Sequence, residues 1–133
     1  MGPVAKSSQK HAHILSPCQQ KPNCVSSVNS EKRRYVAPLQ YSGSAKTARE
    51  ILLKLLNSLK GAHVVTSDDH YIHAEFVSPV FKFVDDVEFS IDENTQKIQL
   101  KSASRVGSYD FGANRKRITT IRDLFAKGIK NGE

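Results

Sequence analysis

Residues 84–101, VDDVEFSIDENTQKIQLK, decide the fold class of this chain. Apolar residues occupy alternate positions on both sides of a polar turn: Val87, Phe89 and Ile91 before it, and Ile98 and Leu100 after it. This period of two is typical of strands that bury one face and expose the other. The intervening Glu93-Asn94-Thr95 favours a turn, so the segment predicts an antiparallel hairpin with one apolar face.

A second hairpin is predicted immediately upstream. Residues 63–67 and 71–78 flank Asp68-Asp69, which favours a turn. Ile72, Ala74 and Phe76 point one way, and Tyr71, His73 and Glu75 point the other. Residues 35–41 have the composition of a further short strand. Pro38 cannot donate a ladder hydrogen bond, so we expect this strand at an edge of the sheet.

Two helices are expected beside these strands. Thr47-Ala48-Arg49-Glu50 fits a capping box at the start of the first, and Ser44 offers an alternative start one turn earlier. The apolar face of this helix comprises Ala48, Ile51, Leu52, Leu55, Leu56 and Leu59, and Gly61 is expected to end it. The second helix is expected to begin near Asn114 and to bury Ile118, Ile121, Phe125 and Ile129.

These elements follow the order β-α-β-β-β-β-α. The order predicts an α+β domain with a mainly antiparallel sheet and both helices packed on its apolar face. It also occurs in helix-grip and TATA-binding-protein-like folds, a likeness that carries no function. Residues 1–32 show no sustained hydrophobic period, so we expect a basic, mostly extended leader followed by a single domain at residues 33–133.

The net charge of +7 is concentrated near the N-terminus. Residues 1–50 hold eight Lys or Arg against two acidic residues, whereas residues 51–133 hold twelve against eleven. A basic leader can contact anionic surfaces, but no basic stripe or nucleic-acid motif follows it, so specific nucleic-acid binding is not expected. No apolar run approaches the roughly 20 residues of a membrane-spanning helix. Without a secretory apolar region before Lys10, a soluble cytoplasmic protein is expected.

Three polar segments are not explained by core packing. They are Pro22-Asn23-Cys24-Val25-Ser26-Ser27, Val84-Asp85-Asp86-Val87-Glu88-Phe89, and Ser102-Ala103-Ser104-Arg105-Val106-Gly107, which continues to Asp110-Phe111-Gly112-Ala113-Asn114-Arg115-Lys116-Arg117. In these segments the chain resembles an uncharacterised bacterial and plastid family, domain of unknown function 1499, over about residues 16–130. Many relatives look membrane-anchored, exported or plastid-targeted, whereas residues 1–10 show no apolar region that would support this. The resemblance implies the fold and the positions of site residues, and no activity.

The predicted ligand-binding residues are Asp86, Glu88, Arg105, Asp110, Asn114 and Arg115, with Cys24 adjacent. On a strand, Asp86 and Glu88 share a face while Asp85 points away, and pairing of residues 84–101 would bring Lys101 and Arg105 opposite them. This arrangement predicts a cross-strand salt-bridge lattice, with a ligand site or a divalent cation as alternatives.

Two interpretations stay open for the loop that leads into the last helix. Arg105, Asp110, Asn114 and Arg115 could form an anion pocket at the helix N-terminus. Alternatively, Asp110 or Asn114 caps the helix and Arg105 ties the loop down. In both cases Gly107 and Gly112 are expected to adopt a positive φ angle.

The two cysteines, Cys18 and Cys24, are separated by five residues. A disulfide, a zinc site with His11 and His13, and a Cys24 nucleophile beside a histidine are alternatives. We expect instead that Cys24 is a small buried group that docks the leader onto the domain. Ser26 and Ser27 would then bond to the backbone.

The leading functional hypothesis is a non-enzymatic binding or accessory module for a small ligand or a protein partner, with no metal and no cofactor. A small hydrolase that uses Cys24 or the carboxylates Asp85, Asp86 and Glu88 is the first alternative. An electrostatic adaptor that works through the basic leader is the second. Neither the ligand nor the oligomeric state follows from the sequence.

Overall fold

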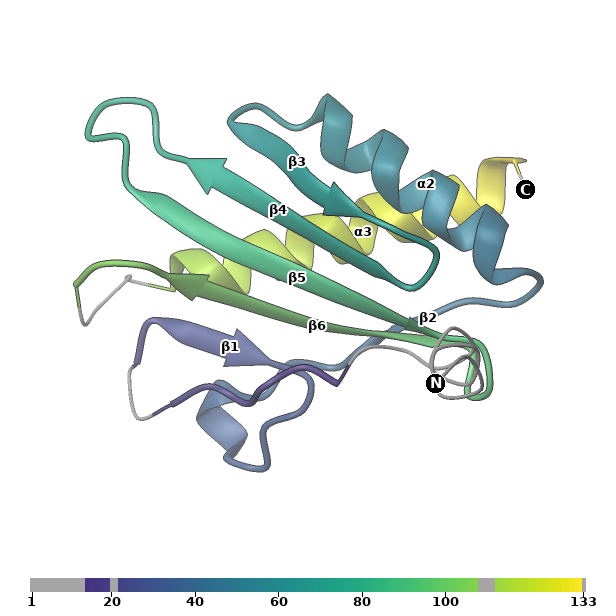
Figure 1. Ribbon diagram of the computed structural model, residues 1–133, viewed down its shortest axis with the longest axis horizontal. Coiled ribbons are helices and arrows are strands. Elements are labelled where there is room, and N and C mark those ends of the chain that lie inside the picture. The colour runs from purple at the N-terminus through teal and green to yellow at the C-terminus, as the bar shows by residue number, and fades with distance from the viewer. Residues whose placement is uncertain (1–13, 20–21, 108–111, 133) are drawn as a thin grey trace, which may run out of the picture.

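The computed structural model describes residues 14–19, 22–107 and 112–132 (Figure 1). Its elements are β1 (Cys24–Ser26), the 3-10 helix η1 (Lys32–Arg34), β2 (Leu39–Gln40), α2 (Ala45–Ser58), β3 (Ala62–Ser67), β4 (Tyr71–Val77), β5 (Val84–Asp92), β6 (Lys97–Ser104) and α3 (Ala113–Gly132). The predicted order of elements is confirmed, and β1 and η1 are added to it.

The strands form one antiparallel sheet in the order β1-β6-β5-β4-β3. The predicted hairpin of β5 and β6 lies at its centre, with Val87 opposite Ser102 and Phe89 opposite Leu100. The short strand β2 also pairs with β6, on the same side as β1. The expected strand after Tyr35 is thus reduced to Leu39–Gln40, and it lies at the edge as Pro38 predicts.

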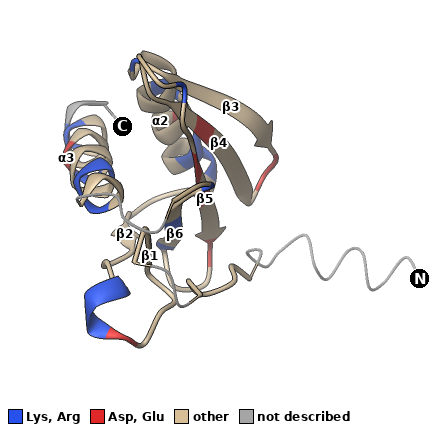
Figure 2. Ribbon diagram, turned by 90° about the vertical axis from the view of Figure 1, so that its left-hand side faces the viewer, with Lys and Arg blue, Asp and Glu red and all other residues tan. Residues whose placement is uncertain are grey.

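Both helices cover one face of the sheet (Figure 2). The alternating apolar residues of the central strands point to that face, and Val87, Phe89, Ile91, Ile98 and Leu100 are fully buried there. α2 and α3 also pack on each other: a Cβ atom added to Gly128 would lie 2.6 Å from Ile51 Cγ2. The α+β class with helices on the apolar side of the sheet is therefore confirmed.

The first helix starts one turn before the capping box that the sequence favours. Ser44 is its N-cap, and its Oγ accepts a hydrogen bond from the Thr47 backbone N–H at 3.0 Å. Thr47 therefore lies inside the helix, and the prediction of a Thr47–Glu50 capping box is wrong. The helix ends at Ser58, and Gly61, with a φ angle of +82°, reverses the chain into β3 beside Val77.

Part of the expected leader belongs to the sheet. Cys24, Val25 and Ser26 form β1 and pair with Ala103, Ser102 and Lys101 of β6. Leu15 and Cys18 are buried as well, and their segment runs beside β1 (Figure 1). Of the helices in the described part of the chain, none is both long and apolar enough to span a bilayer.

Candidate functional site

The sheet face opposite the helices carries polar side chains at alternate positions. They are Tyr71, His73 and Glu75 of β4, Asp86 and Glu88 of β5, Lys101 of β6, and Arg105, which follows β6. We call these seven residues the open-face cluster. All except Arg105 are half-buried, because neighbouring strands screen them while no helix of the described residues covers them. Arg105 is exposed.

Arg105 joins two carboxylates in this cluster. Its Nε donates to Asp86 Oδ2 at 2.8 Å, and its Nη2 donates to Asp86 Oδ1 at 2.9 Å and to Glu75 Oε2 at 2.6 Å. Glu75 and Asp86 are direct cross-strand neighbours, so their like charges would repel without the guanidinium. The predicted salt-bridge lattice is confirmed here, with Glu75 as a member that was not predicted.

His73 and Tyr71 extend the cluster along β4. His73 Nε2 lies 2.8 Å from Asp86 Oδ1, and the Tyr71 hydroxyl donates to Glu88 Oε2 at 2.6 Å. Burial and the Glu88 carboxylate raise the pKa of Tyr71, so its hydroxyl remains a donor at neutral pH. Glu88 is also the cross-strand neighbour of Lys101, as the sequence predicts.

The Arg105 guanidinium holds the pKa of Asp86 below its ordinary value of 3.8. His73 acts in the same direction, and burial opposes both. In turn, Asp86 and Glu75 raise the pKa of Arg105. Asp86 is therefore a carboxylate and not an acid at neutral pH, which suits it to binding a donor and not to giving up a proton.

The substitution Asp86→Asn should lower the free energy of unfolding at neutral pH by up to about 1 kcal/mol, because Arg105 is about half exposed. A lowered folded-state pKa contributes stability above the unfolded-state pKa, and that contribution is lost as pH falls through the folded-state pKa. The stabilities of wild type and variant should therefore converge below about pH 4.

Urea denaturation at a series of pH values measures this convergence. Asp123→Asn, at an exposed position of α3, is the matched control and should follow the wild-type curve. Parallel curves for wild type and Asp86→Asn down to the acid limit would show that the ion pair does not stabilise the fold.

A second polar network lies on the helix side of the same hairpin. Asp85 points there, away from Asp86 as predicted, and forms an ion pair with Arg117 at 2.9 Å. The Arg117 guanidinium lies 4.8 Å from the centre of the Phe76 ring, and its Nη1 donates to Asn114 Oδ1 at 2.8 Å. Asp85, Asp86 and Glu88 therefore do not converge on one point.

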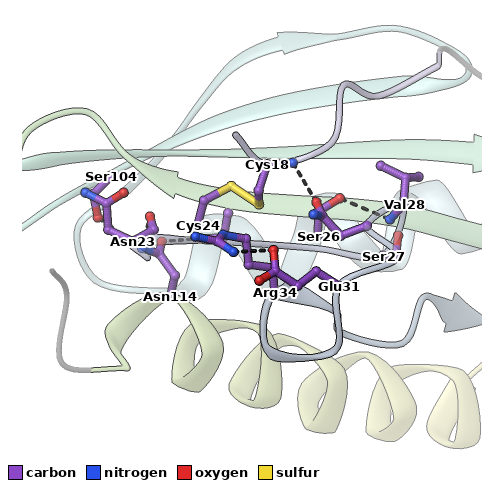
Figure 3. The surroundings of a disulfide bond; sticks show 12 residues. Cys18, Asn23, Cys24, Ser26, Ser27, Val28, Glu31, Arg34, Ser104 and Asn114 are labelled. Carbon is purple, nitrogen blue, oxygen red and sulfur yellow. Dashed lines mark hydrogen bonds and ion pairs between the residues drawn. A yellow bond between two sulfur atoms is a disulfide. The ribbon is translucent and has the colours of Figure 1, made fainter. Parts of the chain in front are cut away.

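Asn114 is fully buried at the centre of this second network (Figure 3). Its Oδ1 accepts from Ser102 Oγ at 2.6 Å, and its Nδ2 donates to the Asn23 carbonyl and to Ser104 Oγ, each at 3.0 Å. The residue lies in the first turn of α3 and joins the helix to β6 and to Asn23, which immediately precedes β1. It does not cap the helix, which begins at Ala113, so the capping interpretation is wrong for Asn114.

The remaining predicted residues lie apart from the open-face cluster. Arg115 donates to the carbonyls of Tyr35 and Arg33 at 3.1 and 2.8 Å, which fastens η1 to α3. Asp110 lies outside the described residues. Gly107 and Gly112 have the expected positive φ angles, +80° and +81°. Of the predicted set, the structure therefore brings together Asp86, Glu88 and Arg105.

Cys24 forms a disulfide with Cys18, and their Cα atoms are 5.7 Å apart (Figure 3). The expectation of a free buried thiol is wrong, because residues 14–19 run back beside β1 and bring the two sulfurs together. Docking through Cys24 is confirmed, since both cysteines are buried and Ser26 and Ser27 accept backbone hydrogen bonds. Cross-strand register places Cys24 opposite Ala103, and Ala103 opposite Asp86.

A family described as a protein of unknown function, DUF1499, matches residues 14–125. The chain belongs to this family. The matched range includes Cys18, β1 and most of α3, so it covers both polar networks of the DUF1499 chain. No curated protein and no solved structure matches it.

Residues of β4 were missing from the predicted site of the DUF1499 chain. The alternation of residues 71–77 places Tyr71, His73 and Glu75 on the polar face, but only pairing with β5 shows that they reach Asp86 and Glu88. One atom each of His73, Glu75 and Asp86 lies within 4.8 Å of the others, a spacing suited to a cation. In this structure the Arg105 guanidinium occupies the position of the cation, because it pairs with both Glu75 and Asp86.

Proposed function

We propose that this DUF1499 chain is a non-enzymatic binding module that holds a small polar ligand on its open-face cluster. The observation that carries the proposal is the position of Arg105. Two carboxylates fix it on a partly exposed face that neither α2 nor α3 covers. Donors and acceptors held in this way need little ordering when a ligand arrives.

Two features favour binding over hydrolysis. Cys24 is joined to Cys18 and has no thiolate to offer while the bridge stands. The carboxylates of the hydrolase alternative are divided between the two faces of the sheet, and Asp86 is held in its charged form by Arg105. Asp86 is therefore not suited to act as the acid of a two-carboxylate mechanism.

Incubation with a low-molecular-mass cell extract followed by native mass spectrometry tests the proposal. We expect an adduct on the wild-type protein that is weakened about tenfold or more by Arg105→Ala, since a charge-assisted hydrogen bond contributes about 1.5–3 kcal/mol. Arg33→Ala, an exposed arginine in a surface ion pair, is the matched control and should retain the adduct. A clean mass for the wild type, or an adduct that Arg105→Ala leaves unchanged, would contradict the proposal.

The adaptor alternative stays a prediction, as does the cytoplasmic location. Most basic residues of the leader lie outside the described part of the chain. Within the described part, Arg34 is buried and paired with Glu31, so it serves the fold and not an external surface.

A further inference from the structure

The loop between β4 and β5 projects apolar side chains into solvent. Val80, Phe81 and Phe83 are 77%, 74% and 54% exposed, and the two phenylalanine rings stack on each other with centres 5.5 Å apart. Val106, which is 57% exposed, lies beside this loop. The N–H of the adjacent Arg105 donates to the Val84 carbonyl at 3.1 Å and brings the two segments together. We call Val80, Phe81, Lys82, Phe83 and Val106 the apolar tip.

Backbone bonds hold this tip away from the core. The Ser78 N–H donates to the Phe83 carbonyl at 2.9 Å, and the Phe83 N–H donates to Ser78 Oγ at 2.9 Å. Lys82 takes a left-handed conformation, with a φ angle of 59°, at the turn between the two rings. Exposing two aromatic rings on a closed turn loses the stabilisation that burying each would give, so packing of the domain does not explain them.

The end of the molecule around the tip carries positive charge. Contacts between Gly61 and Val77, and between Arg105 and Val84, bring the α2–β3 connection and the end of β6 beside the loop. Figure 2 views the molecule from this end. The described residues at 58–62, 77–84 and 112–116 include Lys60, Lys82, Arg115 and Lys116, and no Asp or Glu. Arg105 also lies at this end, but Asp86 and Glu75 balance its charge, so it is not counted here.

We propose that the apolar tip docks on the interfacial region of an anionic lipid bilayer. Aromatic and aliphatic side chains partition into the boundary between headgroups and acyl chains, while lysines beside them bind anionic headgroups. A projecting turn suits such a surface, because a fluid interface closes around a convex tip without a matching pocket. This docking uses the end of the sheet, not the open-face cluster, so it stands or falls separately from the proposed function.

Sedimentation with vesicles measures the docking. The full chain should bind vesicles that contain phosphatidylglycerol and should bind pure phosphatidylcholine vesicles less tightly. The double variant Phe81→Ser/Phe83→Ser should lose about tenfold or more of the partition coefficient, and Lys82→Gln about fivefold. Val65→Ser and Lys127→Gln change an exposed valine of β3 and an exposed lysine of α3, and both should bind like wild type.

A tryptophan placed in the tip supplies a second readout on a folded protein. The chain contains no tryptophan, so Phe81→Trp gives a single tryptophan whose emission can be excited selectively. Its emission should shift to the blue on addition of phosphatidylglycerol vesicles, whereas the emission of Val65→Trp should not move. Failure of the wild type to sediment with anionic vesicles, or an unshifted Phe81→Trp spectrum at saturating lipid, would overturn the proposal.

Discussion

Replacement of Asn114 with alanine should lower the free energy of unfolding by about 3 kcal/mol, the largest effect expected of a polar substitution in this protein. The side chain is fully buried and bonds at once to Asn23, to β6 and to Arg117. Its loss removes one hydrogen bond each from the Asn23 carbonyl, the buried Ser102 hydroxyl and the half-buried Ser104 hydroxyl, and it removes the Oδ1 acceptor of Arg117. Each buried polar group left unpaired costs about 1–3 kcal/mol.

Denaturant unfolding monitored by circular dichroism measures this loss. Asn57→Ala is the matched control, because Asn57 is an exposed residue of α2 and alanine is the better helix former. The control should be neutral or slightly stabilising. A loss below about 1 kcal/mol for Asn114→Ala would mean that the network relaxes around the missing amide or that water replaces it.

The sequence predicts the centre of this fold well because the decisive pattern is local. Alternation within residues 84–101 determines both the strand type and the face of each side chain, so it predicts that Asp85 and Asp86 point apart. The structure places Asp85 on Arg117 and Asp86 on Arg105, as that alternation requires. The alternation of apolar and polar residues predicts the face of each side chain without knowledge of which segments pair.

The edge of the sheet is harder to predict. β1 has three residues, and its pairing joins Cys24 to Ala103, far along the chain. Nothing in a three-residue segment identifies a partner at such a distance. The first helix shows a milder form of the same problem, because Ser44 and Thr47 both suit an N-cap and the structure uses Ser44.

The residues of the candidate site also separate into those that local alternation predicts and those that only strand pairing reveals. Asp86, Glu88 and Arg105 follow from strand alternation, whereas Glu75 and His73 join them only through the register of β4 against β5. Asn114 was expected at the N-terminus of the last helix, either as a cap or in an anion pocket. Its burial depends on Asn23, 91 residues away in the chain, so local chemistry could not have revealed it.

Removal of the disulfide should have the second-largest effect. Cys18→Ala/Cys24→Ala should lower the free energy of unfolding by about 2 kcal/mol, the value that loop-closure entropy gives for a loop of this size. The bridge also fastens residues 14–19, where Leu15 is buried and the Cys18 N–H donates to Asn29 Oδ1 at 2.6 Å. Faster hydrogen exchange should therefore appear first in residues 14–19 and in β1.

Reductant separates the effect of the bridge from the effect of the substitutions. Dithiothreitol should lower the free energy of unfolding of the wild type to about that of the double variant, and it should leave the double variant unchanged. If dithiothreitol changed the free energy of unfolding of neither protein, the bridge would not stabilise the fold. Disulfides persist in oxidising compartments and are rare in the cytosol. Thiol titration of the protein taken from its own cells under rapid acid quench therefore also tests the cytoplasmic prediction: two free thiols would support that location, and none would argue against it.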